Sequence, residues 1–399
     1  MKSLTEYLKE CVVTKETIDN FVDPSINCWA KFDPVVGYTL DNYMPRDGID
    51  GSSTISTAQP SGIRTPHNYA GKPCRINTYG NSFTECHQVS DGETWQEYLA
   101  GHLGEPIRNF GMGGFGVYQA YQRMLRAEES ELGAQHVILY VWGDDHCRSL
   151  MRCRHAVINP WWNGERGLMF HGNFWAHMEM DLDSGNLVER ENRLSTPESL
   201  YRMTEPEFII DSLNDDLMLQ LYVADVVDPS TLDLDALKTL AEILGVEELD
   251  TRSSEHLAQT SRRLRNAYGF AATKLIVEKV SDFCRQKDKK LMTCILCPTA
   301  TKQLLNNQPR YDQEIADHLA EETEPFFDMN VVHRHDYSDF NLSVEDYMKR
   351  YFIGHYNPAG NHFFAYSIKD KIVDWLDPKP ITYRDDVSKT IDFVGYLQE

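Results

Sequence analysis

Short apolar runs alternate with helical segments from about Cys74 onward, and this alternation constrains the fold more than any other feature of the sequence. The apolar runs span 74–79, 106–110 and 136–142, and the residues between them have the spacing of helices. The third run, His136 to Trp142, is continuous, as expected of a strand that is covered on both faces. Strands and helices that alternate in this way predict a parallel sheet built of right-handed crossovers.

The alternation stops at Gly143 and resumes far along the chain. The segment 151–259 is an insertion, in which we expect a hairpin over 168–190 and several short acidic helices from 197 onward. Beyond it the pattern predicts a helix over 261–286, a strand over 290–296, a helix over 311–322, a strand at 330–333 and a last helix from Gly360. The sequence therefore predicts one α/β core, formed by residues 73–150 and 260–380 and split by the insertion.

The two ends of the chain lie outside this alternation. Residues 3–20 have the periodicity of an amphipathic helix, and the following stretch is rich in Gly, Pro, Ser and Asp with a few short edge strands. We expect residues 1–72 to form a helix and an irregular lead-in that pack on the core, and residues 381–399 to form a C-terminal tail.

The net charge disfavours two classes of partner, and the cysteines indicate the redox state of the protein. The chain has 399 residues and a formal net charge of -22, which disfavours nucleic acids and anionic membranes because both attract Lys and Arg. No apolar run approaches the length of a membrane span, and charged residues near the N-terminus come too early for a signal peptide. The nine cysteines are scattered and odd in number. We therefore expect a reduced, cytoplasmic protein with no nucleic-acid or membrane partner, and a homo-oligomer stays open.

Four clusters of polar or small residues follow the predicted strands or precede the last helix. Ser82 comes two residues after Gly80 at the end of the first strand, where open α/β sheets place their chemistry. A glycine-rich turn at 111–116 follows the second strand, and Gly143-Asp144-Asp145-His146 follows the third. The fourth cluster runs from Gly354 to His362, ahead of the last helix.

Each cluster also has a simpler interpretation. A serine such as Ser82 often only caps a helix. The turn 111–116 matches G-x-G-x-x-G, but the acidic ribose ligand of a dinucleotide site is not clearly placed, and close packing of strand and helix explains the glycines equally well. Paired acids beside His146 lack a further metal ligand at short spacing, and Cys294 and Cys297 lie in an apolar run, which favours buried thiols over zinc. We therefore expect neither a metal nor a cofactor.

Taken together, the four clusters resemble the sequence blocks of the SGNH (GDSL-type) serine hydrolases, in the same order and at the same strand ends. Residues 80–84, 109–116, 143–146 and 355–360 are similar to the four blocks, and the resemblance covers roughly 70–150 and 285–377. It implies a three-layer α/β/α fold with a mostly parallel, flavodoxin-like sheet. It also implies that Ser82 is the nucleophile, that His355 is the catalytic base, and that the N–H groups of Ser82 and Gly114 form an oxyanion hole.

Three positions depart from the family pattern. Asn81 stands in place of the first-block Asp. Asp144 or Asp145 stands where the family has an oxyanion-hole Asn, and an ionised carboxylate there would repel an oxyanion. Phe352 replaces the Asp that usually precedes the histidine by three residues, so another group must orient the base. The alternatives are Asp145, Asp336, Asp339, Asp346, a backbone carbonyl, or no partner at all.

The resemblance implies that a small-molecule carboxylic ester, with a small acyl, sugar or aryl group, is cleaved through a Ser–His acyl-enzyme. An acyltransferase acting at the same site and a non-catalytic binding protein are the alternatives. Aromatic and basic residues of the third strand and the insertion are expected to line the substrate or form a lid, unless they form a small core of their own. These residues are Trp142, Arg148, Trp161, Trp162, Phe170, Trp175 and His177.

Overall fold

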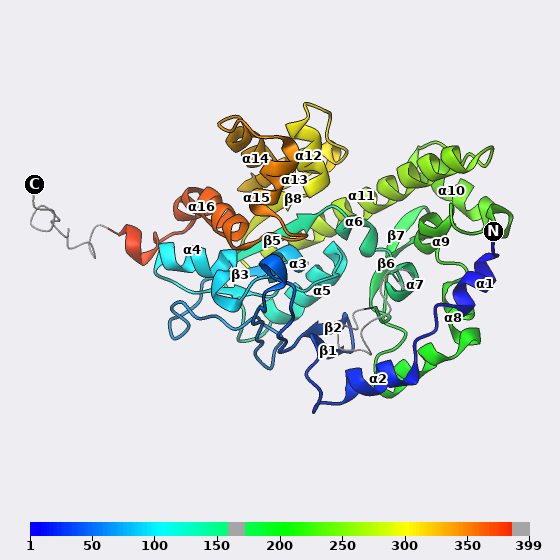
Figure 1. Ribbon diagram of the computed structural model, residues 1–399, viewed down its shortest axis with the longest axis horizontal. Coiled ribbons are helices and arrows are strands. Elements are labelled where there is room, and N and C mark those ends of the chain that lie inside the picture. The colour runs from blue at the N-terminus through cyan, green and yellow to red at the C-terminus, as the bar shows by residue number, and fades with distance from the viewer. Residues whose placement is uncertain (159–171, 385–399) are drawn as a thin grey trace, which may run out of the picture.

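A five-stranded parallel sheet lies at the centre of the computed structural model, which describes residues 1–158 and 172–384 (Figure 1). Its strands, in spatial order, are β4 (Ile107–Asn109), β3 (Ile76–Tyr79), β5 (His136–Trp142), β8 (Lys290–Leu296) and β9 (Phe326–Asp328). Along the chain this is the order 2-1-3-4-5, which changes direction between β3 and β5. The sheet confirms the predicted α/β class.

The strand β5 is central in the sheet, and its residues from His136 to Val141 are buried. It pairs in parallel with β3 and, along its whole length, with β8, from His136–Lys290 to Trp142–Leu296. Because the connections leaving β3 and β5 run to opposite sides, a crevice opens beyond the carboxyl ends of these two strands. That crevice is where a doubly wound sheet places a ligand.

Helices cover both faces of the sheet, which gives three layers. The helices α5 (Val117–Glu128) and α11 (Ser254–Gln286) contribute to one hydrophobic cluster, and α4 (Trp95–Leu103) and α16 (Pro358–Trp375) contribute to the other. Figure 1 shows α4 and α16 side by side, and they are in direct contact. The side chains of β5 alternate between the clusters, as the two-residue period of a strand requires: Val137, Leu139 and Val141 enter the first, and Ile138 and Tyr140 the second.

Capping residues set the bounds of the helices that flank the site. The hydroxyl of Thr94 accepts a hydrogen bond from the N–H of Glu97 at the start of α4, and Gly104 ends that helix in the left-handed conformation. The helix α16 begins after Asn357, whose side chain accepts from the N–H of Gly360.

The N-terminal lead-in and the insertion pack together on the side of the sheet that α5 and α11 cover. Figure 1 shows α1 beside α8, which belongs to the insertion, and the two helices are in contact. Apolar side chains of both segments belong to the same hydrophobic cluster as α5 and α11. The elements of the lead-in are α1 (Leu4–Lys9), α2 (Lys15–Val22), β1 (Ala30–Asp33) and β2 (Gly37–Leu40). Those of the insertion are α7 (His155–Ile158), β6 (His177–Asp181), β7 (Asn186–Arg190), α8 (Pro206–Leu213), α9 (Leu217–Val223) and α10 (Leu234–Leu244).

Short helices connect the remaining strands. They are α3 (Ser82–Glu85), α6 (Asp145–Arg148), α12 (Pro298–Leu305), α13 (Gln313–Glu322), α14 (Met329–Tyr337) and α15 (Val344–Tyr351). Within residues 1–158 and 172–384, none of the helices combines the length and the apolar character that crossing a membrane requires.

Three predicted elements differ from the structure. Residues 330–333, predicted as a strand, lie inside α14, and the fifth strand is β9 immediately before it. Asp328 accepts a hydrogen bond from the N–H of Asn330 and so starts a helix at this point. The helix predicted over 3–20 is divided into α1 and α2, since Thr14 caps a second helix. The helix α11 begins at Ser254, earlier than predicted, with Ser253 as its cap.

Candidate active site

Ser82 and His355 lie within hydrogen-bonding distance beyond the carboxyl end of β3. Ser82 is the first residue of α3, which Asn81 caps by accepting a hydrogen bond from the N–H of Phe83. His355 precedes α16 and is 273 positions further along the chain. The distance between Ser82 Oγ and His355 Nε2 is 2.7 Å. The structure therefore brings together the two residues predicted as nucleophile and base.

A glutamine, Gln88, fixes the other ring nitrogen of His355. Gln88 Oε1 lies 2.9 Å from His355 Nδ1 and 2.9 Å from the backbone N of the same residue. Gln88 Nε2 donates to the backbone oxygen of Asp47 at 3.0 Å. A backbone N–H can only donate and a carbonyl oxygen can only accept, so these two contacts set the orientation of the amide. The Nδ1 atom then carries the proton, and Nε2 is left to accept from the hydroxyl of Ser82.

Glycine at position 354 allows this approach. Gly354 has a φ of +118°, in the region that favours glycine, and a side-chain carbon there would lie 2.8 Å from Gln88 Oε1. Gln88 itself has a φ of 73°, uncommon for a residue with a side chain. Sequence reasoning missed Gln88, which lies four residues beyond the first block, 80–84.

In the described part of the chain, the ring nitrogens of His355 contact Gln88 and Ser82 and none of the carboxylates considered as its partners. Asp336 accepts hydrogen bonds from the hydroxyls of Tyr347 and Tyr351, each at 2.9 Å. Asp346 lies in the first turn of α15, where its N–H donates to the capping hydroxyl of Ser343. Asp339 donates its N–H to the backbone oxygen of Asp336. Phe352, in the place of the expected Asp, stacks on Tyr356 with 4.6 Å between ring centroids.

Buried polar residues of the lead-in hold the loop that carries Gln88. Arg64 is only 3% exposed and pairs with Asp91 at 2.9 Å. Its guanidinium also donates to three backbone oxygens between residues 85 and 89. The side chain of Glu85 accepts from Trp29 Nε1 at 3.0 Å. The lead-in thus positions the site, although the sequence indicated only that it packs on the core.

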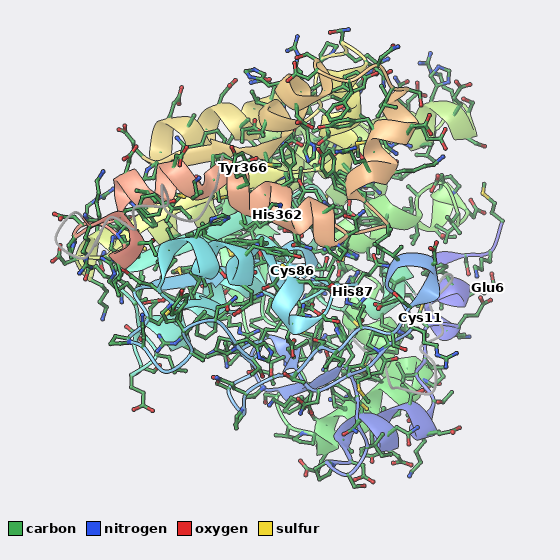
Figure 2. All side chains as sticks on the ribbon, turned by 60° about the vertical axis from the view of Figure 1, so that its left-hand side comes forward. Glu6, Cys11, Cys86, His87, His362 and Tyr366 are labelled. Carbon is green, nitrogen blue, oxygen red and sulfur yellow. The ribbon has the colours of Figure 1, made fainter. Side chains whose placement is uncertain are left out.

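His87 places a positive charge beside His355. Figure 2 shows His87 next to Cys86, just beyond α3, and the rings of His87 and His355 are 5.1 Å apart. Its Nε2 lies 3.1 Å from Asp47 Oδ2 and its Nδ1 lies 3.5 Å from Glu85 Oε1. Burial alone would lower the pKa of His87, but these two carboxylates raise it to about 9.

The ring of His355 is held in its neutral form. Burial, and then the charges of His87 and Arg148, lower the pKa of His355 well below its ordinary value. Because the imidazole is neutral, Nε2 can accept a proton at neutral and mildly acidic pH.

The glycine-rich turn packs closely against α3. A side-chain carbon at Gly111 would lie 2.1 Å from the backbone N of Glu85, and the N–H of Gly113 donates to the Glu85 carboxylate at 2.6 Å. Gly114 has a φ of +82°, which favours glycine. Within the described residues no group accepts a hydrogen bond from the N–H of Ser82 or of Gly114. Among the residues that the structure describes, these two backbone donors at this end of the sheet are thus unpaired.

The two acids after β5 have different surroundings. Asp145 is buried, and its Oδ2 accepts from Asn81 Nδ2 at 2.6 Å and from the N–H of Trp142 at 3.1 Å. Its Oδ1 accepts from Arg148 at 3.1 Å. Burial raises the pKa of Asp145 to about 7, although the charge of Arg148 opposes this shift. The side chain of Asp144 is 63% exposed and lies 3.6 Å from Arg148.

Two of the residues predicted to bind substrate, Arg148 and Trp142, lie near Ser82 and His355. The guanidinium carbon of Arg148 lies 5.2 Å from the ring centroid of Trp142, and Trp142 stacks on Phe83 at 5.7 Å. The ring of Phe83 is in turn 5.1 Å from that of His355. Arg148 and Trp142 therefore form one wall near Ser82 and His355.

The other predicted substrate residues do not join this wall. Trp175 is fully buried, donates to the backbone oxygen of Met151 at 2.5 Å and stacks on Tyr38. His177 is also buried, with Nδ1 3.1 Å from the backbone oxygen of Trp175. These two residues belong to the interior. Trp161, Trp162 and Phe170 lie outside the described residues.

Two residues that the sequence did not single out, Tyr38 and Arg154, lie against Gly114. A side-chain carbon at Gly114 would lie 2.2 Å from Arg154 Nη1 and 2.6 Å from the hydroxyl of Tyr38. That hydroxyl donates to the backbone oxygen of Gly113 at 3.0 Å. Three arginines close together in the sequence, at positions 148, 152 and 154, are the local signal of a basic group here.

Metal ligands do not gather near the site. Among the residues that the structure describes, no group of three or more His, Cys, Asp or Glu side chains is placed to hold a metal ion. His146 is buried with Nδ1 2.8 Å from the hydroxyl of Thr273, and Cys294 and Cys297 are buried free thiols.

A side-chain carbon at Gly116 would lie 2.4 Å from the backbone N of Ser149, so this glycine permits close packing of the turn on α6.

Comparisons with known proteins give no functional assignment. No model of a known protein family matches the chain. No curated protein sequence matches it either. The geometry around Ser82 is therefore the basis on which a function can be assigned.

Proposed function

We propose that this protein is a serine hydrolase that cleaves carboxylic esters through an acyl-enzyme at Ser82. One observation carries the proposal: the chain of hydrogen bonds from Ser82 Oγ through the His355 ring to Gln88 Oε1, with distances of 2.7 and 2.9 Å. A neutral imidazole that contacts a hydroxyl on one side and a fixed acceptor on the other has the geometry for general-base activation of a nucleophile. The similarity of the four sequence blocks to those of the SGNH hydrolases supports the same reaction.

The reaction would proceed in two stages. His355 Nε2 accepts the hydroxyl proton while Ser82 Oγ attacks the carbonyl carbon of the ester. The negative charge that develops on the carbonyl oxygen is stabilised by the N–H groups of Ser82 and Gly114. His355 then gives its proton to the departing alcohol. Water then attacks the acyl-enzyme, again with His355 as the base, and the acid is released from Ser82.

In this proposal the oxyanion hole consists of backbone donors, and Asp145 has a different role from the one expected for it. Both of its carboxyl oxygens already accept hydrogen bonds, and one of them holds Asn81. Asn81 in turn caps the helix that begins with Ser82. We therefore assign Asp145 to positioning the nucleophile, and we assign no catalytic role to the exposed Asp144.

A fluorophosphonate probe tests the proposal directly. We expect the wild-type protein to be labelled and Ser82→Ala to be unlabelled, with Ser184→Ala, a change in an exposed turn, as the matched control. On short p-nitrophenyl esters, Ser82→Ala and His355→Ala should each lower kcat/KM by about a thousandfold or more. Equal labelling of wild type and Ser82→Ala would exclude the hydrolase. A rate that rises with added alcohol or sugar would instead indicate acyl transfer.

A further inference from the structure

Arg154 places a positive charge against the glycine-rich turn. The residue precedes α7, and its Nη1 fills the space beside Gly114 that a side chain would occupy. Within the described residues, Nη1 is buried and has no hydrogen-bond acceptor. Its neighbour Arg152, by contrast, pairs with Glu179 at 2.8 Å and Asp215 at 2.5 Å. Within the described residues Arg154 therefore has no carboxylate at contact distance, and the hydroxyl of Tyr38 and the more distant charge of Asp144 are the groups that favour its charged form.

Arg148 adds a second positive charge close to the same turn. One of its nitrogens lies 3.5 Å from the backbone oxygen of Phe115, directly after Gly114. Burial, and next the charge of Arg148, lower the pKa of Arg154 to about 10. Two guanidinium groups in such proximity repel each other, and an anion between them would relieve that repulsion.

The negative charges nearby are already paired. Asp145 accepts hydrogen bonds from Asn81 and Arg148, and its pKa is raised by burial so that it is only partly ionised near neutral pH. Glu85 and Asp47 flank the charged His87. Arg154 thus stands out as the cation beside the nucleophile for which the described residues supply no carboxylate at contact distance.

We infer that Arg154, with Arg148 beside it, binds a carboxylate of the substrate, and that the preferred substrate is an ester with a carboxylate close to its scissile carbonyl. The inference rests on the proposed hydrolase function. A guanidinium matches the planar geometry of a carboxylate with paired, charge-assisted hydrogen bonds. Because Arg154 touches Gly114, a proposed donor to the carbonyl oxygen, the bound carboxylate lies only a few atoms from that carbonyl. Short hemiesters of dicarboxylic acids have this arrangement.

The test compares esters that differ in charge. The pair p-nitrophenyl acetate and mono-p-nitrophenyl succinate examines a carboxylate on the acyl side, and acetate esters of glycolic acid and ethanol examine one on the alcohol side. We expect wild type to prefer the anionic member of one pair, and Arg154→Gln to reduce that preference in kcat/KM by about ten- to a hundredfold. Arg190→Gln, a change at a half-exposed arginine on β7, should leave the preference unchanged.

Labelling by the fluorophosphonate separates the two proposals. If wild type is not labelled, the hydrolase itself is excluded. If Arg154→Gln is still labelled but loses the preference for anionic esters, the carboxylate site is supported. A wild-type enzyme that favours the neutral esters in both pairs, or an Arg154→Gln variant that retains the preference, would overturn it. Should Arg154→Gln fail to fold, Arg154→Lys decides the matter, since a retained charge without the planar fork should keep only part of the preference.

Discussion

Gln88 Oε1 accepts two hydrogen bonds from His355, one from the ring Nδ1 and one from the backbone N, each 2.9 Å long. A single oxygen therefore fixes both the ring and the main chain of the proposed base. In the Ser-His-Asp arrangement a carboxylate holds the corresponding nitrogen and also stabilises the imidazolium. A neutral amide supplies the orientation without the charge, which agrees with the lowered pKa of His355.

Two replacements of Gln88 separate the orientation of the His355 ring from the effect of a charge beside it. Gln88→Ala should lower kcat by about a hundredfold, because the ring of His355 loses its orientation. Gln88→Glu should retain the orientation and place a negative charge at Nδ1, which raises the pKa of His355. The pH profile of kcat/KM checks this, and we expect its acidic limb to move to higher pH in Gln88→Glu. A limb that stays where it is in wild type would argue against the contact.

The charge on His87 should set the pH at which kcat/KM begins to fall in acid. Since burial and the nearby cations hold the pKa of His355 down, wild-type kcat/KM should stay level from neutral pH to well below the ordinary pKa of histidine. His87→Gln removes one cation and leaves Asp47 and Glu85 uncompensated, so the acidic limb should shift upward. His362→Gln, on the surface of α16 in Figure 2, is the control and should leave the profile unchanged.

Asp145 should make stability depend on pH. Its pKa is raised by burial from an ordinary 3.8 to about 7 in the folded protein. Between these values the folded state keeps a proton that the unfolded chain has released, so this group's contribution to the free energy of unfolding falls as pH rises, by at most about 1.4 kcal/mol per pH unit. The side chain in Asp145→Asn cannot ionise, so the free energy of unfolding of this variant should fall less as pH rises. Denaturant unfolding of both proteins from pH 4 to 8 measures it, and parallel curves would contradict the assignment.

Close packing of the glycine-rich turn on α3 predicts a large stability difference between two glycines. At Gly111 a methyl group would meet the backbone of residues 84 and 85 at 2.1 to 2.4 Å, so Gly111→Ala should destabilise the protein by about 1–3 kcal/mol or more. At Gly101, an exposed position in α4 with nothing within 4 Å, Gly101→Ala should stabilise it by about 0.5–1 kcal/mol. Thermal unfolding of the two variants compares them, and a similar Tm for both would refute the packing argument.

The sheet could be predicted from the sequence where burial leaves a strong pattern. The strands β5 and β8 match the predicted spans 136–142 and 290–296, since strands covered on both faces are continuously apolar. The prediction of a strand at 330–333 was wrong, because a short apolar run is compatible with either a strand or a helix. The cap at Asp328 starts a helix there.

The candidate site could be predicted only in part, because only some of its residues are marked by a local sequence pattern. Ser82, Gly114 and His355 stand at strand ends and in turns, where local pattern is informative. Gln88 and Arg154 reach the site through tertiary packing, and a neutral amide or an isolated arginine in a loop has no spacing that marks its partner. Their roles depend on contacts across the fold, such as the one between Gln88 and the backbone of Asp47.

The separation of 273 positions between Ser82 and His355 has a consequence for synthesis. A ribosome makes Ser82 long before it makes His355, and α16 must then pack on α4 to bring the histidine back to the first strand of the sheet. On the proposed function, a nascent or prematurely ended chain carries an unactivated serine, however well its first half has folded. On that proposal, the hydroxyl of Ser82 becomes activated only once α16 has packed on α4.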